Sequence, residues 1–305
     1  MNKLLIISGP TATGKTDLAV ELAKKYNGEL VSTDSCQIYK GLDIGTGKDQ
    51  PDETPIHLVD LITPDQKFSV AQFQKAGLEI INKLHSQNKL PILVGCSGFY
   101  LDSLINPSYN TFSIKPNKFW RFISTKLSVK ILQKIYKLLD KENFSKLNHS
   151  DINNHYRLTR KIEIKLSTKN SQSTTNNLQS KYDIFHISLI APLDFLYDRI
   201  DKRVQKRIDI GFFDEIKNLL KKYSWKNTGL QIAAYQCLRP YFKNQTDKIL
   251  KECILKWQHA EHSDARRQST YFKSRYQNKA TFFDITSPNF KNQILKLVSK
   301  WYNKL

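Results

Sequence analysis

The chain has 305 residues, 40% of them hydrophobic, which is enough for one substantial core or one core with a smaller appended domain. Its formal net charge of +20 favours a polyanionic partner such as nucleic acid, the alternative being a lysine-rich surface that is merely solvated. No run approaches the roughly 20 apolar residues of a membrane helix and the cysteines form no C-x-x-C pair, so we expect a soluble, cytoplasmic protein without membrane contact, zinc ribbon or disulfide framework.

The N-terminal stretch predicts a phosphate-binding loop between a strand and a helix. An apolar run, Lys3–Ser8, precedes a G-x-x-x-x-G-K-T motif, and a helical pattern follows from Asp17 to Lys25. The motif comprises Gly9, Pro10, Thr11, Ala12, Thr13, Gly14, Lys15 and Thr16. Such a loop turns backbone N–H groups toward an anion, while the lysine reaches a terminal phosphate and the hydroxyl holds Mg²⁺. We therefore expect binding of a di- or triphosphate rather than a chance match in a glycine turn.

The following segments predict an α/β fold with a parallel sheet. Strands are expected at Glu29–Asp34, Pro55–Leu61 and Leu90–Val94, with an amphipathic helix at Ser69–Leu84 and a loop at Gly95–Tyr100. Ligands bind outside the carboxyl ends of strands in such sheets, which places Asp34 near the phosphate loop. The alternative for Asp34 alone is a helix N-cap.

The middle of the chain predicts a helical insertion. Helices are expected over 119–139 and 151–165, the second carrying Arg157, Arg160 and Lys161 on or near one face. A tract rich in Ser, Thr, Asn and Gln at 167–180 reads as a loop. The predicted organisation is a catalytic core in two parts, 1–113 and 182–305, separated by a helical domain at 114–181.

The last third predicts one more strand and several helices. Strand 182–190 is followed by a long helix from Asp194, another helix at 248–275 and an amphipathic segment at 294–302. Arginines 199, 203 and 207 recur every fourth residue, as in a phosphate clamp or a solvated row paired with Asp198 or Glu215. The solvated reading is preferred for Arg207, and His259 with His262 is interpreted as a solvated face.

Residues near the end of the 248–275 helix suggest an RNA surface. The stretch Ala265–Lys273 interleaves cations with aromatic side chains and a glutamine, although a plain basic helix end is the alternative.

The motifs together closely resemble the tRNA dimethylallyltransferases, over nearly the whole chain. The resemblance lies in the phosphate loop and in Asp34-Ser-x-Gln37-Ile-Tyr39, Asp43-Ile-Gly45-Thr46-x-Lys48, Pro55-x-His57-Leu-x-Asp60, Val94-Gly-x-Ser97-Gly-x-Tyr100-Leu101, Arg157-x-x-Arg160-x-x-Glu163, Arg199-Ile-x-x-Arg203 and Ala265-Arg-Arg-Gln268-x-Thr270. It implies a P-loop NTPase-like core with an inserted helical domain that grips the tRNA anticodon stem-loop, in a monomer.

The resemblance also implies an activity: transfer of a dimethylallyl group from dimethylallyl diphosphate to the adenine 3′ of the anticodon. The implied catalytic residues are Asp34, Lys15, Thr16 (with Mg²⁺), Arg203 and Ser97. The implied tRNA contacts are Asp34, Ser35, Cys36, Gln37, Ser97, Arg121, Arg157, Arg160, Arg266, Arg267 and Gln268.

Some positions depart from the family pattern. Val-Gly-Gly-Thr is here Val94-Gly-Cys96-Ser97, and Ile-Gly-Thr-Ala-Lys-Pro is Ile44-Gly-Thr-Gly47-Lys-Asp49. Asn-Asp before the arginine helix is Asn153-Asn154, Arg-Ala-Leu-Glu is Arg160-Lys-Ile-Glu163, Ile-Gly-Tyr is Ile232-Ala-Ala-Tyr235, and Thr-Arg is Glu261-His262. They lie mostly around the RNA and base pocket and bear on tRNA choice and efficiency more than on the reaction class.

Three alternatives stay open from the sequence. An adenylate dimethylallyltransferase would prenylate free AMP, ADP or ATP, but needs neither the helical insertion nor the Arg-Arg-Gln segment. An ATP-binding nucleotide or small-molecule kinase would need only the phosphate loop. A non-catalytic RNA-binding descendant would explain the altered pocket motifs but not the presence of Lys15, Thr16, Asp34 and Arg203.

Overall fold

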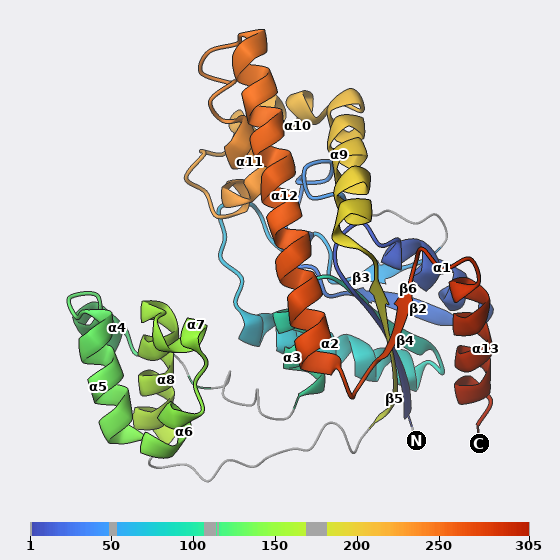
Figure 1. Cartoon of the computed structure of the whole chain (residues 1–305), viewed down its shortest axis with the longest axis horizontal. Helices are drawn as coiled ribbons and strands as arrows, with labels where there is room; N and C mark the ends of the chain where they lie inside the picture. The colour runs from blue at the N-terminus through green and yellow to red at the C-terminus, as the bar shows by residue number, and fades with distance from the viewer. Residues whose placement is uncertain (1, 49–53, 107–113, 115, 169–181, 305) are drawn as a thin grey trace. The chain divides into compact units, whose positions relative to one another are not determined.

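The computed structural model describes residues 2–48, 54–106, 114, 116–168 and 182–304 (Figure 1). The chain divides into two compact units: Met1–Asn106 with Leu178–Leu305, and Pro107–Asn177. Among the described residues, no helix combines the length and apolar character needed to cross a lipid bilayer.

The first unit is built on a parallel sheet of six strands, which confirms the predicted α/β class. Their order in the sheet is β3-β2-β4-β1-β5-β6. The strands are β1 (Asn2–Ser8), β2 (Gly28–Ser32), β3 (Ile56–His57), β4 (Leu90–Gly95), β5 (Tyr182–Ile190) and β6 (Thr281–Asp284). In the central register Ile7 lies beside Val94 and Ile187. The phosphate loop therefore leaves the sheet from its middle.

Alternate residues of β1 enter two separate cores, as the two-residue period of a strand requires. Leu5 and Ile7 pack in a cluster with α1 (Lys15–Lys25) and α13 (Phe290–Tyr302). Leu4 and Ile6 belong to the larger cluster on the other face. That cluster includes residues of α2 (Val70–Ser86), α3 (Gly98–Ile105), α9 (Leu193–Asp209), α10 (Phe212–Leu220), the 3₁₀ helix Gly229–Gln231, α11 (Ala233–Leu238) and α12 (Asp247–Tyr276).

Helix α12 has 30 residues, a length of about 45 Å, and runs alongside α9 (Figure 1). Its last turns are fixed to α3 through Asp102, a buried carboxylate. Asp102 accepts hydrogen bonds from the hydroxyls of Tyr271 and Tyr276, both at 2.6 Å, and from Nε of Arg275 at 2.9 Å. The C-terminal turns of α12 are thereby anchored to α3, the helix that follows β4.

The second unit contains only helices in its described part and has its own core. The helices are α4 (Lys118–Ser124), α5 (Val129–Leu139), α6 (Lys141–Ser145), α7 (His149–Ile152) and α8 (His155–Thr168). Its core consists of Leu132, Tyr136, Leu158 and Ile162.

The structure corrects two expectations about local structure. Gly98–Tyr100 is not a loop but the first turn of α3. The predicted helix at 151–165 is two helices, because the side-chain oxygen of Asn154 accepts the N–H of Arg157 at 3.0 Å and starts a new helix. Within the predicted loop at 167–180, Ser167 and Thr168 end α8, and the remainder lies outside the described residues.

Candidate active site

The loop between β1 and α1 is shaped by close contact with the neighbouring strand. Gly9 has φ of +140°, and a Cβ atom at this position would lie 2.3 Å from the carbonyl oxygen of Leu189 in β5. Ala12 also has a positive φ, of 64°. The backbone therefore turns sharply around a concave centre before α1 begins at Lys15. This is the geometry in which successive N–H groups face an anion.

Lys15 lies across this loop, as the motif predicts. Its buried ammonium donates to the carbonyl oxygen of Pro10 at 2.6 Å and lies 3.4 Å from Oγ1 of Thr13. Thr16 follows in the first turn of α1 and lines the adjoining cavity. The N-terminal end of the helix adds its partial positive charge at the same place.

A cavity of about 460 Å³ adjoins the phosphate loop. Its walls include Lys15, Thr16, Asp34, Gln37, Arg199 and Arg203. The structure thus brings together side chains from α1, the carboxyl end of β2 and α9. The cavity combines two carboxylates, Asp17 and Asp34, with several cations, a composition suited to a phosphorylated ligand and a proton transfer.

Asp34 lies two residues after the end of β2, at the start of a turn where no helix begins, so the helix N-cap reading is wrong. Its Oδ1 accepts the N–H of Cys36 at 2.9 Å, and its Oδ2 accepts the thiol of Cys96 at 3.2 Å. Burial, with the negative charge of Asp34 adding to it, raises the pKa of Cys96 well above its ordinary value. Cys96 therefore stays a protonated donor, and both carboxylate oxygens of Asp34 are held.

Ser97, which lies between β4 and α3, supports the same turn. Its Oγ accepts the N–H of Ser35 at 3.0 Å and lies 3.1 Å from the Ser35 hydroxyl. Gln37 is buried nearby: its side-chain oxygen accepts the hydroxyl of Ser32 at 3.0 Å, and its Nε2 donates to the carbonyl oxygen of Gly47 at 3.3 Å. The turn that carries Asp34 is thus tied to two other segments.

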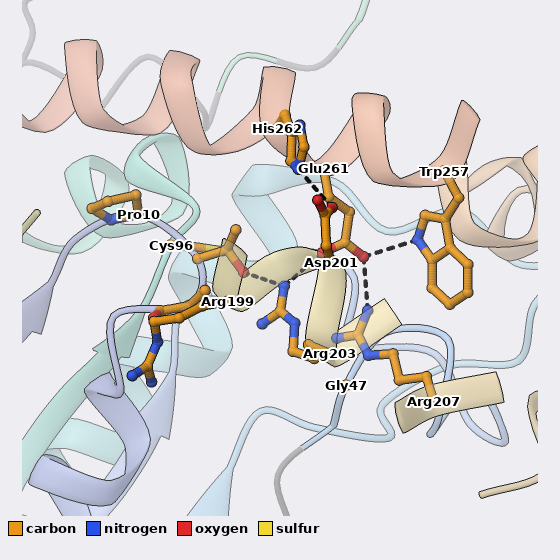
Figure 2. Close-up of polar contacts among 12 residues, drawn as sticks. Pro10, Gly47, Cys96, Arg199, Asp201, Arg203, Arg207, Trp257, Glu261 and His262 are labelled. Atoms are coloured by element: carbon orange, nitrogen blue, oxygen red, sulfur yellow. Dashed lines mark hydrogen bonds and ion pairs between the residues drawn. The ribbon is translucent and has the colours of Figure 1, made fainter. Parts of the chain in front are cut away.

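The arginine row of α9 points toward the phosphate loop and α12 (Figure 2). Arg199 donates from Nε to the carbonyl oxygen of Ala12 at 2.8 Å, and Arg203 donates to Oγ1 of Thr11 at 2.7 Å. Arg207 donates to Glu261 at 2.7 Å and is only 6% exposed. The solvated reading preferred for Arg207 is wrong because α12 covers it.

The predicted surroundings of Glu215 and His262 are also wrong. Glu215 does not pair with an arginine but accepts the backbone N–H groups of Asp43, Ile44 and Gly45 at 2.6 to 3.0 Å. His262 is not on a solvated face: it is half-buried, and its Nε2 lies 2.8 Å from Oδ1 of Asp201. His259 is exposed.

The residues of the Arg266–Gln268 segment of α12 differ in what they contact. The side-chain oxygen of Gln268 accepts the N–H of Thr11 at 2.8 Å, which places this predicted tRNA contact against the phosphate loop. Arg267 is exposed and pairs with Asp264 on its own helix, and Arg266 is exposed.

Within the helical unit, the predicted arginines surround a buried carboxylate. Glu163 accepts from Nε of Arg121 at 3.0 Å, from Arg160 at 2.7 Å and from the N–H of Asn117 at 2.6 Å. Arg160 also donates to the carbonyl oxygen of Ile114 at 2.7 Å. Arg157 is half-exposed and pairs with Asp151. Arg121 therefore fastens α4 to α8, and Arg160 holds α8 to the backbone at Ile114, before α4, whereas Arg157 lies at the surface.

Sequence reasoning assigned no role to Glu261 or Asp102, and it gave Glu215 a pairing with an arginine that the structure does not show. Each is a carboxylate with partners on another element, 58 to 174 positions away for its longest-range bond. The departure at Glu261-His262 from the family pattern was the available signal for Glu261. The motifs gave no comparable signal for the other two.

Comparison with known proteins places this site in a family. A family model described as IPP transferase matches residues 37–275. A tRNA dimethylallyltransferase of Alkaliphilus oremlandii is 36% identical over 288 residues, covering 90% of each chain. Another, of Halalkalibacterium halodurans, is 33% identical over 303 residues, covering 97% of this chain and 95% of its own.

Comparison with solved structures gives a consistent result. The full-length tRNA isopentenylpyrophosphate transferase of Bacillus halodurans has a TM-score of 0.72 and 30% identity, covering 99% of this chain and 97% of its own. A eukaryotic dimethylallyltransferase acting on tRNA shares the fold, with a TM-score of 0.81 at 22% identity, covering 99% and 79%. Because the family model spans most of the chain and relatives exceed 30% identity over nearly all of it, the chain belongs to the IPP transferase family.

Proposed function

We propose that this protein transfers a dimethylallyl group from dimethylallyl diphosphate to N6 of the adenine 3′-adjacent to the anticodon of tRNA. The observation that carries the proposal is the cavity that joins the carboxylate of Asp34 to the phosphate loop and to Arg203. The relatives at 33 to 36% identity named tRNA dimethylallyltransferase support the same reaction. The product would be N6-isopentenyladenosine, with diphosphate released.

Departure of the diphosphate requires positive charge that is in position before the reaction begins. A bond forms between C1 of the dimethylallyl group and N6, and the bond from C1 to the diphosphate oxygen breaks, its electron pair leaving with the diphosphate. The N–H groups of residues 9–14, Lys15 and Arg203 would stabilise the charge that grows on this leaving group. No phosphoryl group moves.

Magnesium fits this donor site. The described residues contain no group of three His, Cys, Asp or Glu side chains that could enclose a metal. Mg²⁺ does not require one, because it is commonly held by one or two protein groups together with waters and substrate phosphates. Thr16, which lines the cavity, would hold the ion through its hydroxyl. When bound, the ion neutralises diphosphate charge.

The acceptor side requires an unstacked adenine. A base cannot react while stacked in the anticodon loop, so it must be flipped into the cavity. There Asp34 would accept a proton from the attacking amine. Gln37 and the hydrogen-bonded pair of Ser35 and Ser97 would form the walls around the base. Arg266, Arg267 and, in the helical unit, Arg157 would contact RNA phosphates. We also propose a cytoplasmic monomer, as the resemblance to the family implies.

The test is incorporation of labelled dimethylallyl diphosphate with Mg²⁺ into an unmodified anticodon stem-loop. We expect label in the RNA and none when the target adenine is replaced by guanine. AMP and ATP are offered as separate acceptors, and label there instead would identify an adenylate dimethylallyltransferase. ATP turnover without prenyl transfer would identify a kinase. RNA binding without any label would identify a binding protein and contradict the proposal.

A further inference from the structure

Glu261 is a largely buried carboxylate of α12 that faces α9 and that the proposed reaction does not use. It accepts from Arg203 at 2.6 Å, from Arg207 at 2.7 Å and from Nε1 of Trp257 at 2.9 Å (Figure 2). Burial alone would raise its pKa, but the charges of Arg207 and Arg203 and its hydrogen bonds outweigh burial and lower it. Glu261 is therefore an ionised anchor with both oxygens occupied.

The anchor fixes the direction of Arg203. One terminal nitrogen of this guanidinium donates both to Glu261 and, at 2.7 Å, to Oγ1 of Thr11 in the phosphate loop. Its Nε is buried and has no hydrogen-bond partner within the part of the chain that the structure describes. Because a guanidinium is planar and rigid, holding one nitrogen on two acceptors also fixes where the others point. Arg203 lines the cavity, so its remaining donors suit an anionic ligand there.

The anchor also seats Arg207, in space that only glycine leaves open. A Cβ atom at Gly47 would lie 1.9 Å from a terminal nitrogen of Arg207, and Gly47 has φ of +59°. The carbonyl oxygen of Gly47 accepts from Gln37. Glu261 thus connects, through Arg207, to the loop that holds Gln37 in the cavity wall.

We infer that Glu261 is a positioning residue of the donor site: it holds Arg203 in the orientation that binds diphosphate, and Gly47 is its required counterpart beneath Arg207. The identity of the ligand rests on the proposed function. A carboxylate near an anion site also repels the anion, so a residue that only balanced charge would weaken diphosphate binding. The two roles therefore predict opposite effects when the charge of Glu261 is removed.

The experiment measures calorimetric binding of inorganic diphosphate with Mg²⁺ to the full chain. In Glu261→Gln, we expect the dissociation constant to rise about tenfold, as loss of charge-assisted hydrogen bonds implies. Glu261→Asp keeps the charge but is one methylene shorter, so positioning predicts that it does not restore binding. Glu252→Gln, an exposed position on the same helix, removes the same charge and should leave binding unchanged.

Gly47→Ala provides a test that keeps Glu261 intact. Displacement of Arg207 should again weaken diphosphate binding, by about fivefold or more, and a thermal transition retained in this variant separates the effect from unfolding. If Glu261→Gln does not fold, Gly47→Ala and Glu261→Asp decide the matter. Diphosphate binding that is unchanged or tighter in the folded variants would overturn the inference. Since this readout needs no tRNA, failure of prenyl transfer by the wild-type protein would instead contradict the proposed function.

Discussion

The thiol of Cys96 donates to Oδ2 of Asp34 at a sulfur-to-oxygen distance of 3.2 Å. The other oxygen of Asp34 accepts the backbone N–H of Cys36. The carboxylate is therefore held both by its own turn after β2 and by a side chain that follows β4. Because burial keeps the Cys96 thiol protonated, this contact persists at neutral pH. A residue that departs from the family pattern thus supports the residue proposed as the base.

Replacing Cys96 with alanine should lower kcat for prenyl transfer by about tenfold, which corresponds to the loss of one hydrogen bond to a charged group. The KM for dimethylallyl diphosphate should stay nearly constant, because the hydrogen bond that Cys96 donates goes to Asp34, on the acceptor side of the cavity. Steady-state kinetics with the anticodon stem-loop measures both quantities. Cys96→Ser keeps a donor and should recover most of the activity; a serine variant as slow as the alanine variant would contradict the assigned contact.

Replacing Asp34 with asparagine should reduce turnover by about 10² to 10⁴, the usual contribution of a positioned general base. The dissociation constant for tRNA should change little, because most of that affinity comes from phosphate contacts elsewhere. Single-turnover kinetics and a filter-binding titration separate the two effects. Loss of turnover and tRNA affinity together would show that Asp34 serves the fold or the RNA surface.

The core elements could be predicted from the sequence because their signals are local. The apolar run Lys3–Ser8, the glycine motif and the helical pattern after it are contiguous, and β5 begins and ends where its alternation does. β6 has only four residues, too few for a periodic pattern, and it is defined by pairing with β5. The break before α8 depends on the single side-chain cap of Asn154.

Only the residues of the site whose position follows from a nearby strand could be predicted. Lys15 and Thr16 follow the loop after β1, and Asp34 comes two residues after β2, so the parallel direction of these strands places all three at one edge of the sheet. The environment of Arg207 depends instead on Glu261, 54 positions later on a different helix. Spacing within α9 shows that three arginines share a face, but it cannot show which partner covers that face.

Glu163 should be a main determinant of stability in the helical unit. Changing it to glutamine leaves Arg121 and Arg160 short of a charged partner, at a cost of about 3 kcal/mol in the free energy of unfolding of this unit. Hydrogen exchange at the buried positions Leu158 and Ile162 would report the loss.

The matched control is Asp151→Asn, which weakens the partly exposed pairs with Arg157 and Lys161 and should cost less than about 1 kcal/mol. Exchange in β1 should be unaffected by either change, because that strand belongs to a separate core. Equal protection of α8 in the two variants would contradict the assignment of Glu163.

His186 should make the first unit sensitive to mild acid. Burial lowers the pKa of His186 to about 3, and its Nε2 lies 2.8 Å from Oγ of Ser8. Since an unfolded histidine titrates near 6.5, the unfolded state binds one more proton below that pH. Stability is therefore complete above about pH 6.5 and falls as pH drops toward 3, by at most about 1.4 kcal/mol per pH unit.

The measurement is the free energy of unfolding by denaturant at several pH values between about 5 and 7, where carboxylates remain ionised. In His186→Gln the slope of stability against pH should fall by the contribution of one proton, although the variant is less stable at neutral pH. His259→Gln, at an exposed position, should leave the slope unchanged. Parallel curves for the wild-type chain and His186→Gln would mean that His186 takes up its proton equally in both states, contrary to its burial beside Ser8.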